Sequence, residues 1–85
     1  MENEGKLRQD IDRGEKAQAL LRNEIHIETI DFLEKQYHDA WENSSVDQAE
    51  AREKVFMMLQ NLHTVKQHIE SVVMTGKLAN DRLTN

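Results

Sequence analysis

The segment VFMMLQNLHTVKQHIESVVMTGKLANDRL, residues 55–83, decides the fold class of this chain of 85 residues. Its apolar and small residues recur at alternating steps of three and four, and none of them is charged: Val55, Met58, Leu62, Val65, Ile69, Val72, Gly76, Ala79 and Leu83. Such a heptad stripe is the seam by which one α-helix packs against another. The sequence therefore predicts a long helix whose seam is covered by the first half of the chain or by a second copy.

The composition extends this expectation to the whole chain. There is no proline, glycine occurs only 3 times, and the remaining residues are largely good helix formers. Apolar periodicity stops at residues 42–45, and Ser45 precedes Gln48 by the three residues of a capping box. We therefore predict an all-α fold in which a helix over about 14–42 and a helix over about 46–75 form a long antiparallel hairpin within a single domain, 1–85.

The ends of these helices depend on two glycines. Gly14 is a plausible helix break, so residues 1–12 are expected to form an N-terminal extension that frays. Gly76 is a candidate C-cap, but Ala79 and Leu83 keep the spacing of the seam. Residues 77–85 are therefore either a C-terminal tail or a continuation of the helix.

The first predicted helix is apolar on two faces, and a helix of that kind needs two covers. The second helix supplies one cover, and we expect another protomer to supply the other, so that hairpins self-associate into a helical bundle. A small chain without cysteine also has few other sources of stability. The candidate partner or oligomer contacts are Ile27, Ile30, Tyr37, Trp41, Phe56 and Met57. For Tyr37 and Trp41 we favour the alternative that they close the hairpin end of the bundle.

Few residues suggest chemistry. Glu34, His38 and Glu42 are spaced four apart on one helical face and offer metal-ligand atoms, but one helix leaves the coordination incomplete. We interpret them as a solvated polar face and expect no metal and no cofactor. The chain has no HExxH motif, no glycine-rich phosphate loop, no GxSxG motif and no cysteine nucleophile. A non-enzymatic protein is therefore expected.

Charge and hydropathy bear on partners and location. The net charge of −5 argues against direct nucleic-acid binding, because such proteins usually carry a basic face. No apolar run reaches the roughly 18 residues of a membrane span, and the acidic N-terminus is not a secretory signal peptide. We expect a cytoplasmic or virion-associated protein.

Four strings of the sequence, in this order and spacing, carry a resemblance. They are Arg13-Gly14-Glu15-Lys16-Ala17 with Leu20-Leu21, Tyr37 with Ala40-Trp41, Arg52-Glu53-Lys54, and Thr75-Gly76-Lys77-Leu78-Ala79. The chain resembles small helical proteins of tailed bacteriophages and prophages that are often encoded among capsid and DNA-packaging genes. The resemblance implies an accessory or virion-assembly component and assigns no functional residue. Two alternatives remain: an acidic inhibitor or regulator that binds a host protein, and a DNA-packaging adaptor with a hairpin oligomerisation core.

Overall fold

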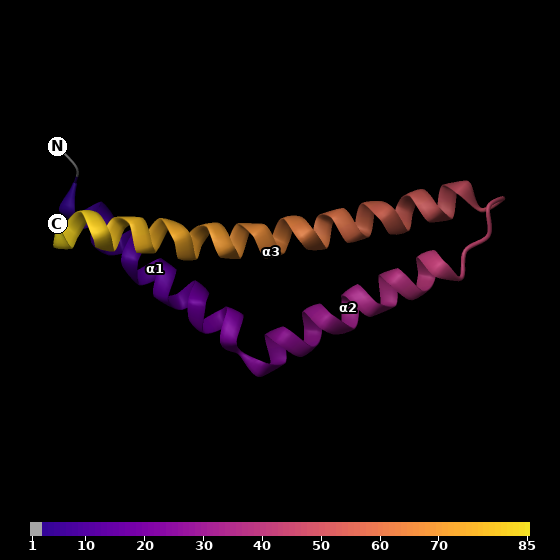
Figure 1. Ribbon diagram of the computed structural model, residues 1–85, viewed down its shortest axis with the longest axis horizontal. Coiled ribbons are helices and arrows are strands. Elements are labelled where there is room, and N and C mark those ends of the chain that lie inside the picture. Colours follow the sequence, from indigo (N-terminus) through magenta and orange to yellow (C-terminus); the bar gives the residue numbers. More distant parts are fainter. Residues whose placement is uncertain (1–2) are drawn as a thin grey trace. The chain divides into compact units, whose positions relative to one another are not determined.

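The structure, a computed structural model, describes residues 3–85, and its secondary structure in this range consists of α1 (Glu4–Arg22), α2 (Glu24–Glu42) and α3 (Ala49–Thr84) (Figure 1). The all-α prediction is confirmed. The chain divides into two compact units. In the first unit, α1 packs with the C-terminal part of α3, which begins at Gln67; the second unit comprises Glu24–Lys66, with α2 and the N-terminal part of α3.

The prediction of one helix over 14–42 is wrong, because the chain leaves the helical conformation at Asn23. This residue has an extended backbone, with φ −68° and ψ 124°, and its N–H donates to the Leu20 carbonyl at 3.1 Å. Asparagine is a weak helix former whose side chain competes for backbone hydrogen bonds. Gly14, which we expected to break the helix, lies within α1. The helix begins before it at Glu4, where the Asn3 side chain accepts from the Gly5 and Lys6 N–H groups.

The loop between α2 and α3 contains half of the predicted capping box. The Ser45 N–H donates to Gln48 Oε1 at 2.9 Å, as a capping box requires, but the Ser45 hydroxyl donates to Asp47. The Arg52 N–H bonds the Gln48 carbonyl at 3.0 Å, so α3 begins at Ala49 and not near residue 46. At its other end α3 continues through Gly76 to Thr84 and does not stop at 75.

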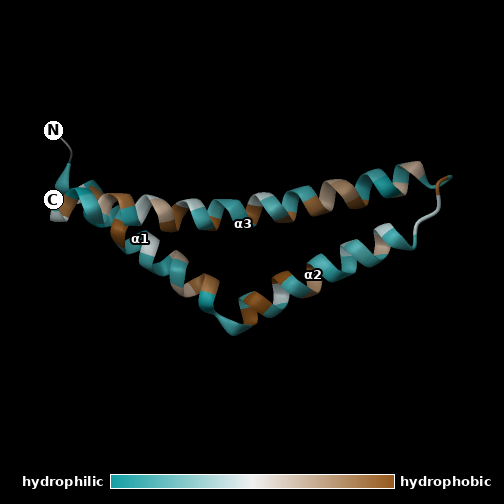
Figure 2. Ribbon diagram, viewed as in Figure 1, coloured by the Kyte–Doolittle hydropathy of each residue, from teal (hydrophilic) through white to brown (hydrophobic). Residues whose placement is uncertain are grey.

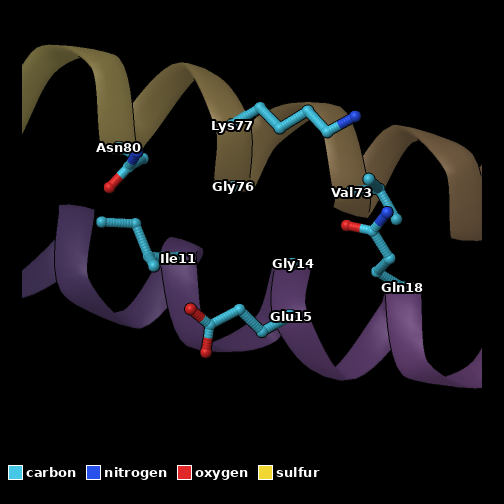
Figure 3. Close-up of a pocket in the computed structure, with 8 residues that line it drawn as sticks. All are labelled: Ile11, Gly14, Glu15, Gln18, Val73, Gly76, Lys77 and Asn80. Carbon is cyan, nitrogen blue, oxygen red and sulfur yellow. The ribbon is translucent and has the colours of Figure 1, made fainter.

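The first unit is held by a direct approach of two helix backbones. Gly14 and Gly76 are both buried, and a Cβ built on Gly14 would lie 2.9 Å from the Gly76 Cα. Ala79, one turn further on, is 3% exposed. Figure 3 shows the two glycines facing each other, with side chains of α1 and α3 around a depression of about 200 Å³. Small residues of the heptad stripe thus allow α1 to pack closely against α3.

The second unit is an antiparallel helical hairpin with a thin core. Leu62 is 8% exposed and is the one buried apolar side chain among the described residues of this unit. Val55 and Leu59 on α3, with Ile30 and Leu33 on α2, are only half-buried. Hydrophobic segments recur along α2 and α3 between hydrophilic ones (Figure 2). Much of the apolar surface of this hairpin therefore remains uncovered.

Candidate protein interaction surface

The N-terminal part of α3 carries two overlapping lines of apolar contact. From Val55 onward its buried and half-buried positions are Val55, Leu59, Leu62 and Lys66, which step by four, three and four. The heptad stripe instead runs through Met58, Leu62 and Val65, and Met58 and Val65 are 48% and 50% exposed. We call the first line the covered seam and the second the open seam. The two lines share Val55 and Leu62. The face of α3 along the covered seam is packed, and the adjacent face along the open seam is not.

The other residues of the predicted seam lie in better-packed surroundings. Gly76 and Ala79 are buried, and Ile69, Val72 and Leu83 are half-buried. All five belong to the first unit, where α1 supplies the cover. The stripe thus loses its cover only where α3 runs beside α2.

A groove follows the open seam. It has a volume of about 260 Å³ and is lined by Tyr37 from α2 and by Met58, Asn61, Leu62 and Val65 from α3. None of these residues is charged. Tyr37 is half-buried and forms one wall. An uncharged groove between two helices is suited to binding the apolar face of a third helix.

A second, more polar groove of about 400 Å³ is lined by Glu34, His38, Phe56, Leu59, Gln60, Leu62 and His63. Phe56 is 51% exposed. Glu34 Oε1 lies 2.6 Å from Lys66 Nζ, and both side chains are more than one third exposed. An ion pair this exposed contributes only about 0–1 kcal/mol.

The residues considered as metal ligands are only partly brought together. Glu34 and His38 line the same groove, where His63 joins them from α3, whereas Glu42 is exposed at the last position of α2. Within residues 3–85, no group of three His, Asp or Glu side chains is placed to hold a metal ion. The arrangement offers polar contacts beside an exposed phenylalanine.

Trp41 closes the loop end of the hairpin through a contact that the sequence analysis missed. The Arg52 guanidinium carbon lies 4.2 Å from the centre of the Trp41 ring, which is a cation–π geometry. Trp41 is 37% exposed. Arg52 Nε is buried and has no hydrogen-bond partner among the described residues. The sequence did contain a signal for this contact. Trp41 lies near the end of one helix, and Arg52 lies in the first turn of the next helix, across a short loop.

The remaining candidate contacts differ in exposure. Ile27 and Met57 are 44% and 56% exposed, whereas Ile30 is half-buried. Within the second unit, three exposed large apolar side chains were not among the candidates: Ile25 at 67%, Phe32 at 59% and Val46 at 86%. Ile25 and Phe32 are seven residues apart and share one side of α2.

Charge distinguishes the two helices of the second unit. The eleven residues Val55–Val65 of α3 contain no Asp, Glu, Lys or Arg, although 32% of the whole chain is charged. By contrast, α2 contains six acidic residues and one lysine, Lys35, which pairs with Asp39 at 3.2 Å. The charge-free run is visible in the sequence and could have identified this segment as a contact region.

None of the described helices is both long enough and apolar enough to cross a bilayer. Comparisons with known protein families, with curated proteins and with solved structures find no match to this chain.

Proposed function

We propose that this protein is a non-enzymatic helical interaction protein that self-associates through its second unit. The observation that carries the proposal is the uncovered apolar surface of that unit. Nine large apolar side chains of Glu24–Lys66 are 37–86% exposed: Ile25, Ile27, Phe32, Trp41, Val46, Phe56, Met57, Met58 and Val65. In a monomer, such a surface lowers the solubility and contributes no burial to the stability of the fold.

The exposed area is of the size that an interface uses. If a large apolar residue presents roughly 150–200 Å² when fully exposed, these nine leave about 800 Å² open to water. A standard interface buries about 800 Å² per partner. The nine side chains do not share one face, so a single contact covers part of this area.

The thin core of the hairpin supports the same proposal. Burying one leucine side chain contributes roughly 1.5–3 kcal/mol, which is small beside the entropy lost in ordering some forty residues. Leu62, at 8% exposed, is the single buried large side chain among the described residues of the second unit. A packed partner would add the missing burial.

The resemblance to small phage proteins adds a setting to this proposal. In that setting the protein is an accessory or assembly component in the host cytoplasm or on the virion, where it holds copies of itself or a virion protein in register. Self-association is the part of the proposal that the surface of the second unit supports directly.

A second candidate function is an acidic regulator that docks on a cationic protein surface. The observation that favours it is the composition of α2, in which Glu34 pairs with Lys66 and Asp39 with Lys35. The carboxylates of Glu24, Glu28, Asp31 and Glu42 form no ion pair within residues 3–85. Glu24, Glu28 and Asp31 are close along α2 to the exposed Ile25 and Phe32, a combination that suits a basic amphipathic helix.

Sedimentation equilibrium of the full chain at several concentrations tests the main proposal. We expect a dimer or larger species in the micromolar range, with helix content that rises as the oligomer forms. A monomer that unfolds cooperatively, with a midpoint independent of concentration, would contradict self-association and leave the regulator as the better candidate.

A further inference from the structure

We infer that the second copy docks along the open seam, so that the Val55–Val65 segments of two α3 helices lie antiparallel about a two-fold axis. This inference rests on the proposed self-association and specifies its interface. It assigns Met58, Asn61 and Val65 to the contact, with the axis passing near Asn61 and Leu62. Each Met58 then lies opposite Val65 of the second copy.

The two seams of α3 give the geometric reason. A helix inside a four-helix bundle contacts two neighbours, and it needs two adjacent apolar stripes to do so. The covered seam meets α2 through Val55, Leu59 and Lys66, while the open seam begins next to it and shares Leu62. The groove beside Tyr37 lies along the open seam. A helix in this groove would cover the exposed Met58 and Val65 on either side of the buried Leu62.

The distribution of charge indicates which apolar surface of the second unit two copies of the chain can share. Like charges that face each other across an interface oppose association. Val55–Val65 contains no charged residue, so two copies of this segment meet without repulsion. By contrast, α2 contains six acidic residues and one lysine, so two copies of α2 brought face to face would repel each other. Among the apolar surfaces of the second unit, the open seam is therefore the one suited to self-pairing.

Parallel and antiparallel pairs of α3 helices can both be two-fold symmetric, and the helix dipoles favour the antiparallel pair. With a two-fold axis perpendicular to α3, position 58 of each copy meets position 65 of the other. Residues 58 and 65 are equidistant from an axis between positions 61 and 62. Antiparallel helices also bring opposite dipole ends together, which favours this arrangement over a parallel one.

A matched pair of charge substitutions tests the assignment. Met58→Glu places a carboxylate in the open seam, whereas Phe56→Glu places one in the other groove, at a side chain of nearly equal exposure. We expect Met58→Glu to raise the dissociation constant by about tenfold or more, and Phe56→Glu to change it by less than about threefold. Circular dichroism at high protein concentration establishes that both variants remain helical.

Disulfide cross-linking provides an independent readout, because the natural chain contains no cysteine. We expect a mixture of Met58→Cys and Val65→Cys chains to form a mixed disulfide under mild oxidation. Met58→Cys alone and Phe56→Cys alone should cross-link far less. This readout does not require a destabilising charge, so it applies even if Met58→Glu unfolds the hairpin.

The outcomes separate the two proposals. If the natural chain is a monomer, both the self-association and its interface are wrong. If it is a dimer in which Phe56→Glu dissociates the chains and Met58→Glu does not, only the interface is wrong. Efficient cross-linking of Met58→Cys to itself, without the mixed product, would likewise overturn the antiparallel pairing and leave self-association intact.

Discussion

At the scale of single residues, Gly14 and Gly76 are required by the contact between two helices. A Cβ on Gly76 would lie 2.9 Å from both the Asp10 carbonyl oxygen and the Gly14 Cα, so a side chain at either position meets backbone and has no room to rotate away. Glycine inside a helix is usually a cost of about 1 kcal/mol relative to alanine. Here the close backbone contact offsets that cost.

We predict that Gly14→Ala destabilises the protein. Alanine gains about 1 kcal/mol of helix propensity, but overpacking against backbone costs about 1–3 kcal/mol, so we expect a net loss of about 1 kcal/mol. Urea unfolding at a fixed protein concentration measures it. Gly5→Ala in the same helix is the control, because its Cβ would meet no backbone atom of another helix and its nearest neighbour, at 3.2 Å, is the Asn3 side-chain oxygen. Equal or greater stability of Gly14→Ala would show that the helices separate freely at this contact.

The loop residue Asp47 gives a prediction about pH. The hydrogen bond that the Ser45 hydroxyl donates, together with a backbone hydrogen bond, lowers the pKa of Asp47 below its ordinary value of 3.8. A lowered pKa in the folded state means that the ionised carboxylate stabilises the fold above the unfolded pKa. This contribution is lost as the pH falls through the folded pKa.

We therefore expect Ser45→Ala to raise the pKa of Asp47 toward its ordinary value, as measured by an NMR titration of the Asp47 carboxyl carbon. Ser71→Ala is the matched control, because the Ser71 hydroxyl bonds the His68 carbonyl in another part of the chain. An unchanged Asp47 titration in Ser45→Ala would show that the hydroxyl does not hold the carboxylate in solution.

At the scale of elements, the packing of the hairpin depends on Leu62, where the covered and open seams meet. We predict that Leu62→Ala costs about 2–5 kcal/mol, the usual range for a buried leucine. His38→Ala should cost less than about 0.5 kcal/mol, because an exposed helix position contributes little. Thermal unfolding of the two variants at equal concentration makes the comparison. Similar melting temperatures would contradict the assignment of the α3 faces.

The sequence predicted the type of every described element but not the position of the break in its first half. Gly14 looked like the break because glycine favours loops in isolation, and its partner Gly76 is distant in sequence. Asn23 lacked the composition of a strong breaker, so a helix over 14–42 seemed continuous. Local propensity cannot distinguish a glycine that ends a helix from one that lets another helix approach.

The sequence predicted only part of the candidate surface, because the rest depends on contacts between helices that are distant in sequence. The heptad stripe identified Met58, Leu62 and Val65 as one seam, but the sequence does not show which of two overlapping stripes α2 covers. Which stripe is covered depends on how α2 lies beside α3. The ion pair between Glu34 and Lys66 shows that α2 lies along the covered seam. The charge-free run Val55–Val65 was readable from the sequence and points to the same region.

At the scale of the whole molecule, the net charge is confined to one unit. The second unit contains nine acidic and four basic residues, whereas the rest of the chain contains seven of each, so the net charge of −5 belongs to Glu24–Lys66. Self-association through the second unit therefore brings two acidic surfaces toward each other. The open seam keeps the contact itself neutral, but repulsion persists around it.

We predict that salt strengthens self-association. Raising the ionic strength from about 0.05 M to 0.5 M shortens the Debye length from roughly 14 Å to 4 Å and screens the repulsion between the second units. The dissociation constant measured by sedimentation should fall several-fold. Binding to a cationic partner through α2 would show the opposite dependence. Weaker self-association at high salt would mean that ion pairs between copies hold the oligomer.

The division of α3 between two units has a consequence for how long its backbone amides stay protected from solvent exchange. Its C-terminal part is fixed by the backbone contact at Gly76, whereas its N-terminal part depends on a single buried leucine. Amide exchange proceeds through local opening, which is rarer where packing is closer. In dilute protein, the amides of residues 67–84 should therefore exchange more slowly than those of 49–66. Concentrating the protein should slow exchange in the second segment only, because association adds contacts there.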